Sequence, residues 1–133
     1  FDCANGSASA TARKLFEKLG VKCHMLSDAP DGVNINTNCG STHLENLQKV
    51  VVENGCDLGF AFDGDADRCI CVDDQGNVVD GDFIMAICAK DMKERGVLKG
   101  NTAVVTIMSN IGFKLFAKEN DIIVKARPVV LGV

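Results

Sequence analysis

Three aspartates at alternate positions are the residues of this sequence whose types and spacing suggest chemistry most directly. Asp63, Asp65 and Asp67 lie within five residues, in the stretch Phe-Asp-Gly-Asp-Ala-Asp-Arg that follows an apolar run. On a loop that contains glycine such side chains can converge, and carboxylates held close together raise one another's pKa. A hard divalent cation removes that penalty, because Mg²⁺ and Ca²⁺ prefer oxygen ligands such as carboxylates. The spacing therefore predicts a metal site, and the alternative is a solvated acidic turn.

An EF-hand calcium loop also begins with Asp-x-Asp-x-Asp, but the rest of this stretch does not fit one. That loop needs glycine at its sixth position, glutamate at its twelfth and a helix on each side. Counted from Asp63, the sixth position is Arg68 and the twelfth is Asp74, and the flanking residues are typical of strands. The EF-hand interpretation is therefore rejected.

A second interpretation is a phosphatase of the haloacid-dehalogenase-like class. Residues 58–65 resemble the start of those enzymes, in which an apolar strand leads into Asp-x-Asp and the first aspartate, here Asp63, is the nucleophile. Asp67 stands where that class has Thr or Val, and the later paired aspartates that follow a lysine are missing. This interpretation is kept as the weaker alternative, together with a metal-binding module that has no catalytic activity.

A third interpretation accounts for most of the chain. Residues 63–68 resemble the metal loop of the α-D-phosphohexomutase superfamily. Further stretches resemble the second domain of that family or, in particular, its phosphoglucosamine mutase branch, and these are residues 2–6, 31–36, 39–43, 79–82 and 106–110. The resemblance extends from the first residue to about residue 125.

The resemblance implies a role for each charged residue of the loop. Asp63, Asp65 and Asp67 would bind Mg²⁺, and Arg68 would be a catalytic residue that faces the active-site cleft and helps to offset the charge of a phosphate. The residue pattern alone leaves a second possibility for Arg68, which is an ion pair with the acidic loop at the edge of a strand.

The family enzyme has four domains around one cleft, and the resemblance implies which of them are present. Residues 1–79 would form the second domain, with the metal loop, and residues 80–133 would form an incomplete start of the third. The full-length parent would be an isomerase that interconverts glucosamine 6-phosphate and glucosamine 1-phosphate through a phosphoserine and a bisphosphate. The phosphosugar and the other domains of the same chain would be its partners. The phosphoserine and sugar-binding loops are missing from this sequence, so we expect the chain by itself to be inactive.

The elements that must position the loop follow from apolar periodicity, which predicts strands that alternate with amphipathic helices. This order is typical of the α/β class, and we expect a layered α/β/α fold with a mostly parallel, mixed sheet flanked by helices. Thr42 and Glu45 form a sequence pattern typical of a capping box that opens a helix. Strands are expected at residues 2–4, 21–26, 58–62, 69–72, 78–79, 103–108 and 122–124, and helices at 9–19, 44–55, 81–95 and 111–119.

Composition excludes some classes of function. The 133 residues carry a net charge of −4, which gives no basic face for nucleic acid, and no apolar run reaches the length of a membrane span. The seven cysteines show no Cys-x-x-Cys spacing, and we interpret them as small apolar residues in a reducing cytoplasm. The chain has no initiator methionine and begins on the end of a strand, as an excised fragment would.

Overall fold

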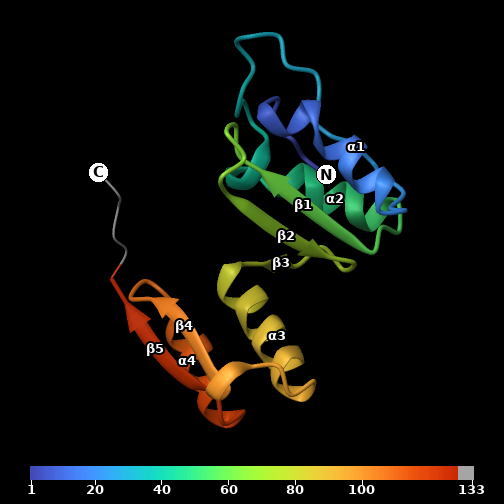
Figure 1. Ribbon diagram of the computed structural model, residues 1–133. Helices are drawn as coiled ribbons and strands as arrows, with labels where there is room; N and C mark the ends of the chain where they lie inside the picture. Colours follow the sequence, from blue (N-terminus) through green and yellow to red (C-terminus); the bar gives the residue numbers. More distant parts are fainter. Residues whose placement is uncertain (129–133) are drawn as a thin grey trace. The chain divides into compact units, whose positions relative to one another are not determined.

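The computed structural model describes residues 1–128, and its contacts divide the chain into two compact units. Unit 1 is Phe1–Val79, and unit 2 begins at Asp80. Each unit combines helices with its own sheet, so the mixed α/β fold expected from the sequence is confirmed (Figure 1). The end of the predicted second segment, residues 129–133, lies outside the described residues. None of the helices in the described part is both long and apolar enough to cross a membrane.

The sheet of unit 1 is mixed. Its named strands β1 (Leu58–Phe62), β2 (Cys69–Asp73) and β3 (Val78–Val79) are antiparallel neighbours in the order β1-β2-β3. Isolated parallel bridges join Asp2 to Ala61 of β1 and to Leu26, so the first residues lie between two parallel neighbours. The strand expected at residues 21–26 is reduced to this bridge at Leu26.

Helices cover both faces of this sheet, because alternate residues of a strand point to opposite faces. Ala61 packs with Leu47 and Val51 of α2 (Glu45–Glu53), whereas its neighbour Phe62 packs against the cluster of Cys3, Ala8 and Ala12. The latter two residues belong to the short 3₁₀ helix η1 (Ser7–Ala10) and to α1 (Ala12–Lys18). Unit 1 is therefore a three-layer α/β/α arrangement.

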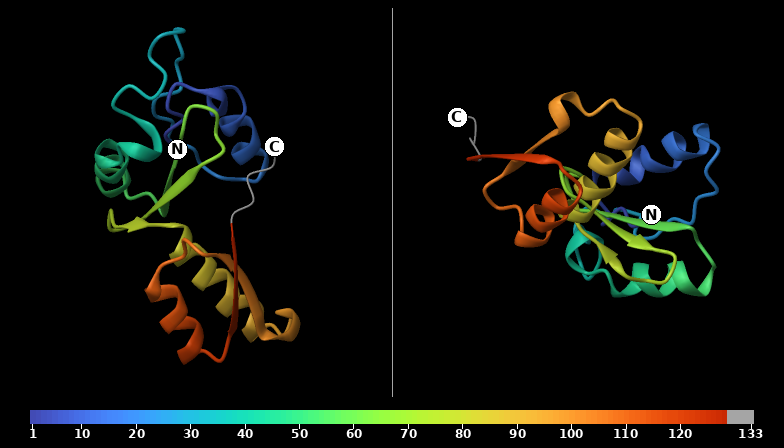
Figure 2. Two further views of the ribbon diagram at one scale, coloured as in Figure 1. Left: turned by 90° about the vertical axis from the view of Figure 1, so that its left-hand side faces the viewer. Right: turned by 90° about the horizontal axis from the view of Figure 1, so that it is seen from below.

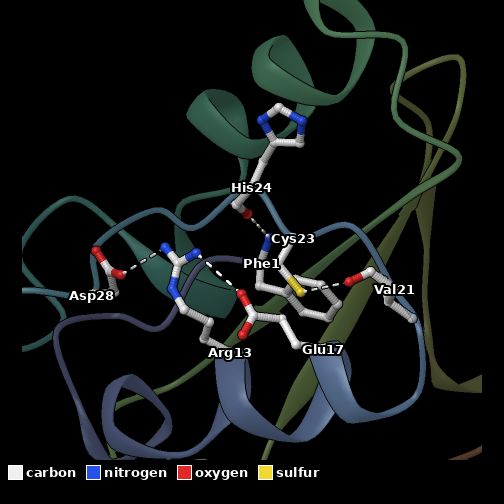
Figure 3. Close-up of polar contacts among 7 residues, drawn as sticks. All are labelled: Phe1, Arg13, Glu17, Val21, Cys23, His24 and Asp28. Atoms are coloured by element: carbon white, nitrogen blue, oxygen red, sulfur yellow. Dashed lines mark hydrogen bonds and ion pairs between the residues drawn. The ribbon is translucent and has the colours of Figure 1, made fainter.

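Aromatic and polar contacts fix the α1 layer to the start of the chain. The ring of Phe16 in α1 stacks on Phe1 with 4.1 Å between centroids, and Phe1 stacks on Phe60 of β1 at 5.5 Å. Figure 3 shows Arg13 between Glu17 and Asp28, at 3.7 Å from each. The aromatic stack holds α1 against β1, and the exposed pair of Arg13 with Asp28 joins α1 to residues 21–28.

Unit 2 contains a parallel strand pair and two helices. α3 (Gly81–Glu94) is followed by the 3₁₀ turn η3 (Lys99–Asn101), β4 (Thr102–Thr106), α4 (Ile111–Glu119) and β5 (Ile123–Arg127). β4 and β5 pair in parallel, and Figure 2 shows α3 and α4 side by side next to them. Its core consists of buried residues from α3, β4, α4 and the position before β5, packed against partly buried Val124 of β5, and these buried residues are Ala89, Val105, Phe113, Ala117 and Ile122.

The two long helices of unit 2 are capped by side chains, as residue type favours. Asp80 Oδ1 accepts the backbone N–H of Phe83 at 3.0 Å, and Asn110 Oδ1 accepts that of Phe113 at 2.9 Å. The predicted capping box in unit 1 is wrong. Thr42 ends the 3₁₀ turn η2 (Gly40–Thr42), and α2 begins at Glu45 after Leu44, with no side-chain cap.

All seven cysteines lie in the described residues and are free thiols. Cys3 and Cys39 are buried, as expected for small apolar side chains, whereas Cys69 and Cys88 are exposed. Burial raises the pKa of the Cys3 thiol to about 11, so this thiol is unreactive at neutral pH.

Candidate metal centre

The acidic turn that joins β1 to β2 brings its three carboxylates together. The backbone folds back at Ala66, whose φ is +59° and whose N–H donates to the carbonyl of Asp63 at 3.0 Å. One carboxylate oxygen from each of Asp63, Asp65 and Asp67 lies within 4.8 Å of the others. Among the described residues this is the one group of three or more acidic, histidine or cysteine side chains close enough to share a metal ion.

The three carboxylates differ in exposure and in electrostatics. Asp63 is only 4% exposed, whereas Asp65 and Asp67 face solvent. Burial acts to raise the pKa of Asp63, but the hydrogen bonds and the charge of Arg68 overcome it and hold this pKa below its usual range. The pKa of Asp67 is raised, first by the charge of Asp65 and then by that of Asp63. A cation between the three carboxylates would relieve this repulsion, so the donor set fits a hard divalent ion.

Arg68 donates two hydrogen bonds to Asp63. Its backbone N–H donates to Oδ1 at 3.1 Å and its Nε–H to Oδ2 at 2.7 Å, while Nε lies 3.7 Å from Asp67 Oδ1. The sequence pattern left two possibilities for Arg68, which were this ion pair with the acidic turn and a catalytic role in the active-site cleft. The structure shows the pairing, and the side chain is still 71% exposed.

Two glycines let neighbouring loops close on the turn. A Cβ on Gly6 would overlap the carbonyl oxygen of Gly64, which accepts the backbone N–H of Ser7 at 2.8 Å. A Cβ on Gly64 would lie 2.7 Å from Ile35 Cδ1 and 2.8 Å from Asn36 Nδ2. Glycine is therefore required at position 6, where the close approach is to backbone, whereas a Cβ at position 64 would force the side chains of Ile35 and Asn36 to move.

Sequence analysis did not identify Ile35 and Asn36 as neighbours of the metal turn. They lie on the loop of residues 27–39, and the Asn36 N–H donates to the carbonyl of Ala4 at 2.9 Å. The side chain of Asn5 also bonds to this loop, since its Oδ1 accepts the N–H of Ala29 at 3.2 Å. The available signal was Gly64 itself, because an isolated glycine beside a strand often marks a close backbone approach.

Comparisons with known proteins follow the division into two units. Residues 1–76 match the family described as phosphoglucomutase/phosphomannomutase, alpha/beta/alpha domain II, and residues 80–129 match its alpha/beta/alpha domain III. The chain is 56% identical over 127 residues to a phosphoglucosamine mutase of Clostridium novyi, and 56% identical over 121 residues to one of Clostridium perfringens. These matches cover 95% and 91% of the chain but only 28% and 27% of the relatives.

Solved structures give a similar result. A phosphoglucomutase/phosphomannomutase family protein from Burkholderia thailandensis superimposes with a TM-score of 0.75 at 27% identity, over 97% of this chain and 28% of its own. A structure described as a phosphomannomutase from Thermus thermophilus gives a TM-score of 0.67 at 16% identity, over 95% of this chain and 30% of its own, and supports the fold alone. The chain therefore spans somewhat more than a quarter of the length of the proteins it matches.

Proposed function

The chain belongs to the phosphoglucomutase/phosphomannomutase family, and we propose that it is the metal-binding part of a phosphoglucosamine mutase. The single observation that carries the proposal is the convergence of three carboxylate oxygens at the end of β1, in the segment that matches the family's domain II. The identity of 56% to phosphoglucosamine mutases supports the choice of branch. The parent would be a cytoplasmic isomerase that interconverts glucosamine 6-phosphate and glucosamine 1-phosphate.

In this proposal residues 1–79 are domain II, residues 80–133 begin domain III, and Asp63, Asp65 and Asp67 hold Mg²⁺. A bound Mg²⁺ supplies positive charge that stabilises the oxygens of a phosphoryl group in transfer. Asp63 is ready to bind a cation because its carboxylate stays ionised despite burial, through the hydrogen bonds of Arg68. Asp65 and Asp67 face solvent, so a ligand from outside can reach them.

Arg68 is the proposed catalytic residue, with its exposed guanidinium near the phosphate of the substrate. Phosphoryl transfer depends mainly on positioning and charge stabilisation, and a metal site beside an arginine supplies both. The phosphoserine that donates the phosphoryl group and the loops that bind the sugar would come from the rest of the parent chain. We therefore propose that these 133 residues alone do not catalyse the reaction.

The phosphatase alternative gains no support from the geometry. Both oxygens of Asp63 accept hydrogen bonds from Arg68, and a carboxylate stabilised in this way is a weaker nucleophile. The match to two consecutive domains of a mutase family also argues against a module that only binds metal.

The test is a substrate comparison with the full-length protein. We expect a higher kcat/KM for glucosamine 6-phosphate than for mannose or glucose 6-phosphate in the presence of Mg²⁺ and a hexose bisphosphate activator. Asp65→Asn should abolish the activity, and Asp74→Asn, an exposed aspartate outside the group of three, should not. Release of inorganic phosphate instead of isomerisation would overturn the proposal. A preference for mannose or glucose phosphate would overturn the branch assignment alone.

A further inference from the structure

Two of the seven cysteines stand at alternate positions of β2. Cys69 and Cys71 are separated by Ile70, and alternate residues of a strand point to the same face of the sheet. Cys69 is exposed and Cys71 is partly exposed, so a small molecule in solution can reach both thiols. The other five cysteines are far from this pair in the sequence.

The face of the sheet that carries this pair is apolar. In the register of β1 with β2, Phe62 lies opposite Cys69 and Phe60 lies opposite Cys71. Residues directly opposite each other in an antiparallel pair are neighbours on one face. Both phenylalanines are partly buried, so an uncharged ligand suits the surroundings of the two thiols better than a charged one.

The two thiols lie close enough to influence each other. Burial, followed by the neighbouring thiol of Cys71, raises the pKa of Cys69 to about 11. Burial also raises the pKa of Cys71. Both thiols are therefore protonated at neutral pH and are poor nucleophiles. A ligand that binds them must take up the two protons as it does so.

A disulfide does not fit this geometry well. Cα atoms two residues apart in a strand are separated by about 6.6–6.8 Å, whereas a disulfide usually joins Cα atoms about 5.5–6 Å apart. A third atom bonded to both sulfurs spans more, since at about 2.3 Å for each bond, as in zinc thiolates, it bridges sulfurs almost 4 Å apart. Zinc itself needs about four ligands, and this pair offers two. Trivalent arsenic that already carries one organic group needs only two.

We propose that Cys69 and Cys71 form a two-thiol binding site for a trivalent organic arsenical, R–As=O. Two As–S bonds form in place of the bonds between arsenic and oxygen, and the two thiol protons leave with the oxygen as one molecule of water. Arsenic stays trivalent, so the step needs no oxidant or reductant, and the product is uncharged. This inference does not depend on the proposed function, because it involves neither the metal turn nor a phosphosugar.

The probe is phenylarsine oxide, added to the 133-residue chain with an excess of glutathione, a single thiol that competes for arsenic at isolated cysteines. We expect the intact mass to show one phenylarsenic unit per chain in place of two hydrogens. Dithiothreitol should remove this unit, because it offers two thiols at once. After proteolysis the arsenic should lie on the peptide that contains residues 69–71. An adduct on any other peptide, or no adduct on the wild type, would overturn the proposal.

Single substitutions test whether both thiols are needed. Cys69→Ser and Cys71→Ser should each weaken binding by about 100-fold or more, because the second bond of a two-point attachment typically adds about 10²–10⁴ in affinity. The matched control is Cys88→Ser, which removes an exposed cysteine that is alone on α3 and should leave binding unchanged. Backbone amide exchange of β1 and β2 checks that each variant is folded. Unchanged affinity in a folded Cys69→Ser or Cys71→Ser would also overturn the proposal.

Discussion

Two acidic turns lie at opposite ends of β2, and although both begin with aspartate and contain a glycine, their structures differ. The metal turn, residues 63–68, precedes β2, and the second turn, residues 73–77, follows it. Each begins with an aspartate whose two oxygens accept hydrogen bonds from within the turn. Asp63 is bound by Arg68, whereas Asp73 Oδ1 accepts the N–H groups of Gln75 and Asn77, at 3.0 and 2.7 Å, and its Oδ2 accepts Asn77 Nδ2 at 3.0 Å.

The difference lies in what surrounds the first aspartate. In the metal turn Asp65 and Asp67 return towards Asp63, and the loop that carries Ile35 covers Gly64. In the second turn a neutral amide completes the bonding of Asp73, and Gln48 of α2 donates to the carbonyl of Gly76 at 2.6 Å. The candidate metal site is thus distinguished from the structural turn by the convergence of three carboxylates on one point.

The largest expected effect comes from the same substitution at the first position of each turn. Asp63→Asn removes a charged ligand, and we expect Mn²⁺ affinity to fall by about 100-fold or more, the upper end of what is lost with an outer-shell partner. Asp73→Asn should leave Mn²⁺ affinity unchanged. Water proton relaxation measures both. Similar losses of Mn²⁺ affinity in Asp63→Asn and Asp73→Asn would mean that the two turns bind metal alike, which would contradict the difference in their geometry.

The next comparison replaces the glycine in each of the two turns by alanine. Gly64→Ala should destabilise unit 1 by about 1–3 kcal/mol, because the new methyl group must displace Ile35 and Asn36. Gly76→Ala should cost about 1–2 kcal/mol for a different reason, since its φ of +85° is strained for residues with a Cβ. Amide exchange of β1 and β2 measures both. Of the two variants, only Gly64→Ala should also weaken Mn²⁺ binding. Weaker Mn²⁺ binding in both variants would contradict the proposed difference between the two turns.

The loop over the metal turn should contribute less. Ile35→Ala removes a half-exposed side chain that contacts Gly64, and we expect a loss of about 1 kcal/mol in the stability of the turn, below the range for fully buried positions. Val33→Ala, on the same loop but 85% exposed, should change stability by less than about 0.5 kcal/mol. Amide exchange at residues 63–68 is the measurement. Equal effects would show that the loop does not support the turn.

The smallest effect is the response of the second turn to pH. The side chain and backbone N–H of Asn77 hold the pKa of Asp73 below its usual value. A lowered pKa in the folded state adds stability above the ordinary pKa of about 3.9, and this stability is lost as the pH falls through the folded pKa. The difference in urea midpoint between wild type and Asp73→Asn should therefore shrink between about pH 6 and pH 3. A constant difference would rule out this linkage.

Local signals allowed most elements to be predicted. β1, β3 and α4 have the predicted bounds, because their apolar patterns end at polar residues or glycine. The start of α2 was predicted wrongly for a tertiary reason. Gly40 has a φ of +77°, and a Cβ there would lie 2.5 Å from the carbonyl oxygen of Phe62, so packing shapes residues 40–42 into a separate turn. The sequence between Cys39 and Glu45 has no pattern that would predict this contact between Gly40 and Phe62.

For the candidate site, too, the local geometry could be predicted from the sequence and the long-range contacts could not. Asp63, Asp65 and Asp67 lie on one short turn, so their convergence depends on local backbone geometry, and metal binding by them stays a prediction. The sequence did not show which group the Arg68 side chain would contact, because this side chain is long enough to reach either the acidic turn or a bound ligand. Gly6 and the loop at Ile35 both approach the metal turn, although they are far from it in the sequence. Apolar periodicity gives no information about such long-range contacts.

The stack of Phe1, Phe16 and Phe60 also offers a position for a spectroscopic probe. The chain has no tryptophan and no tyrosine, so it has almost no absorbance or emission of its own in the near ultraviolet. Phe60 lies between sheet and helix, 5.5 Å from one ring of the stack and 6.2 Å from the other. Tryptophan at this position would be the single fluorophore, and its emission would report the melting of unit 1 while unit 2 remained dark.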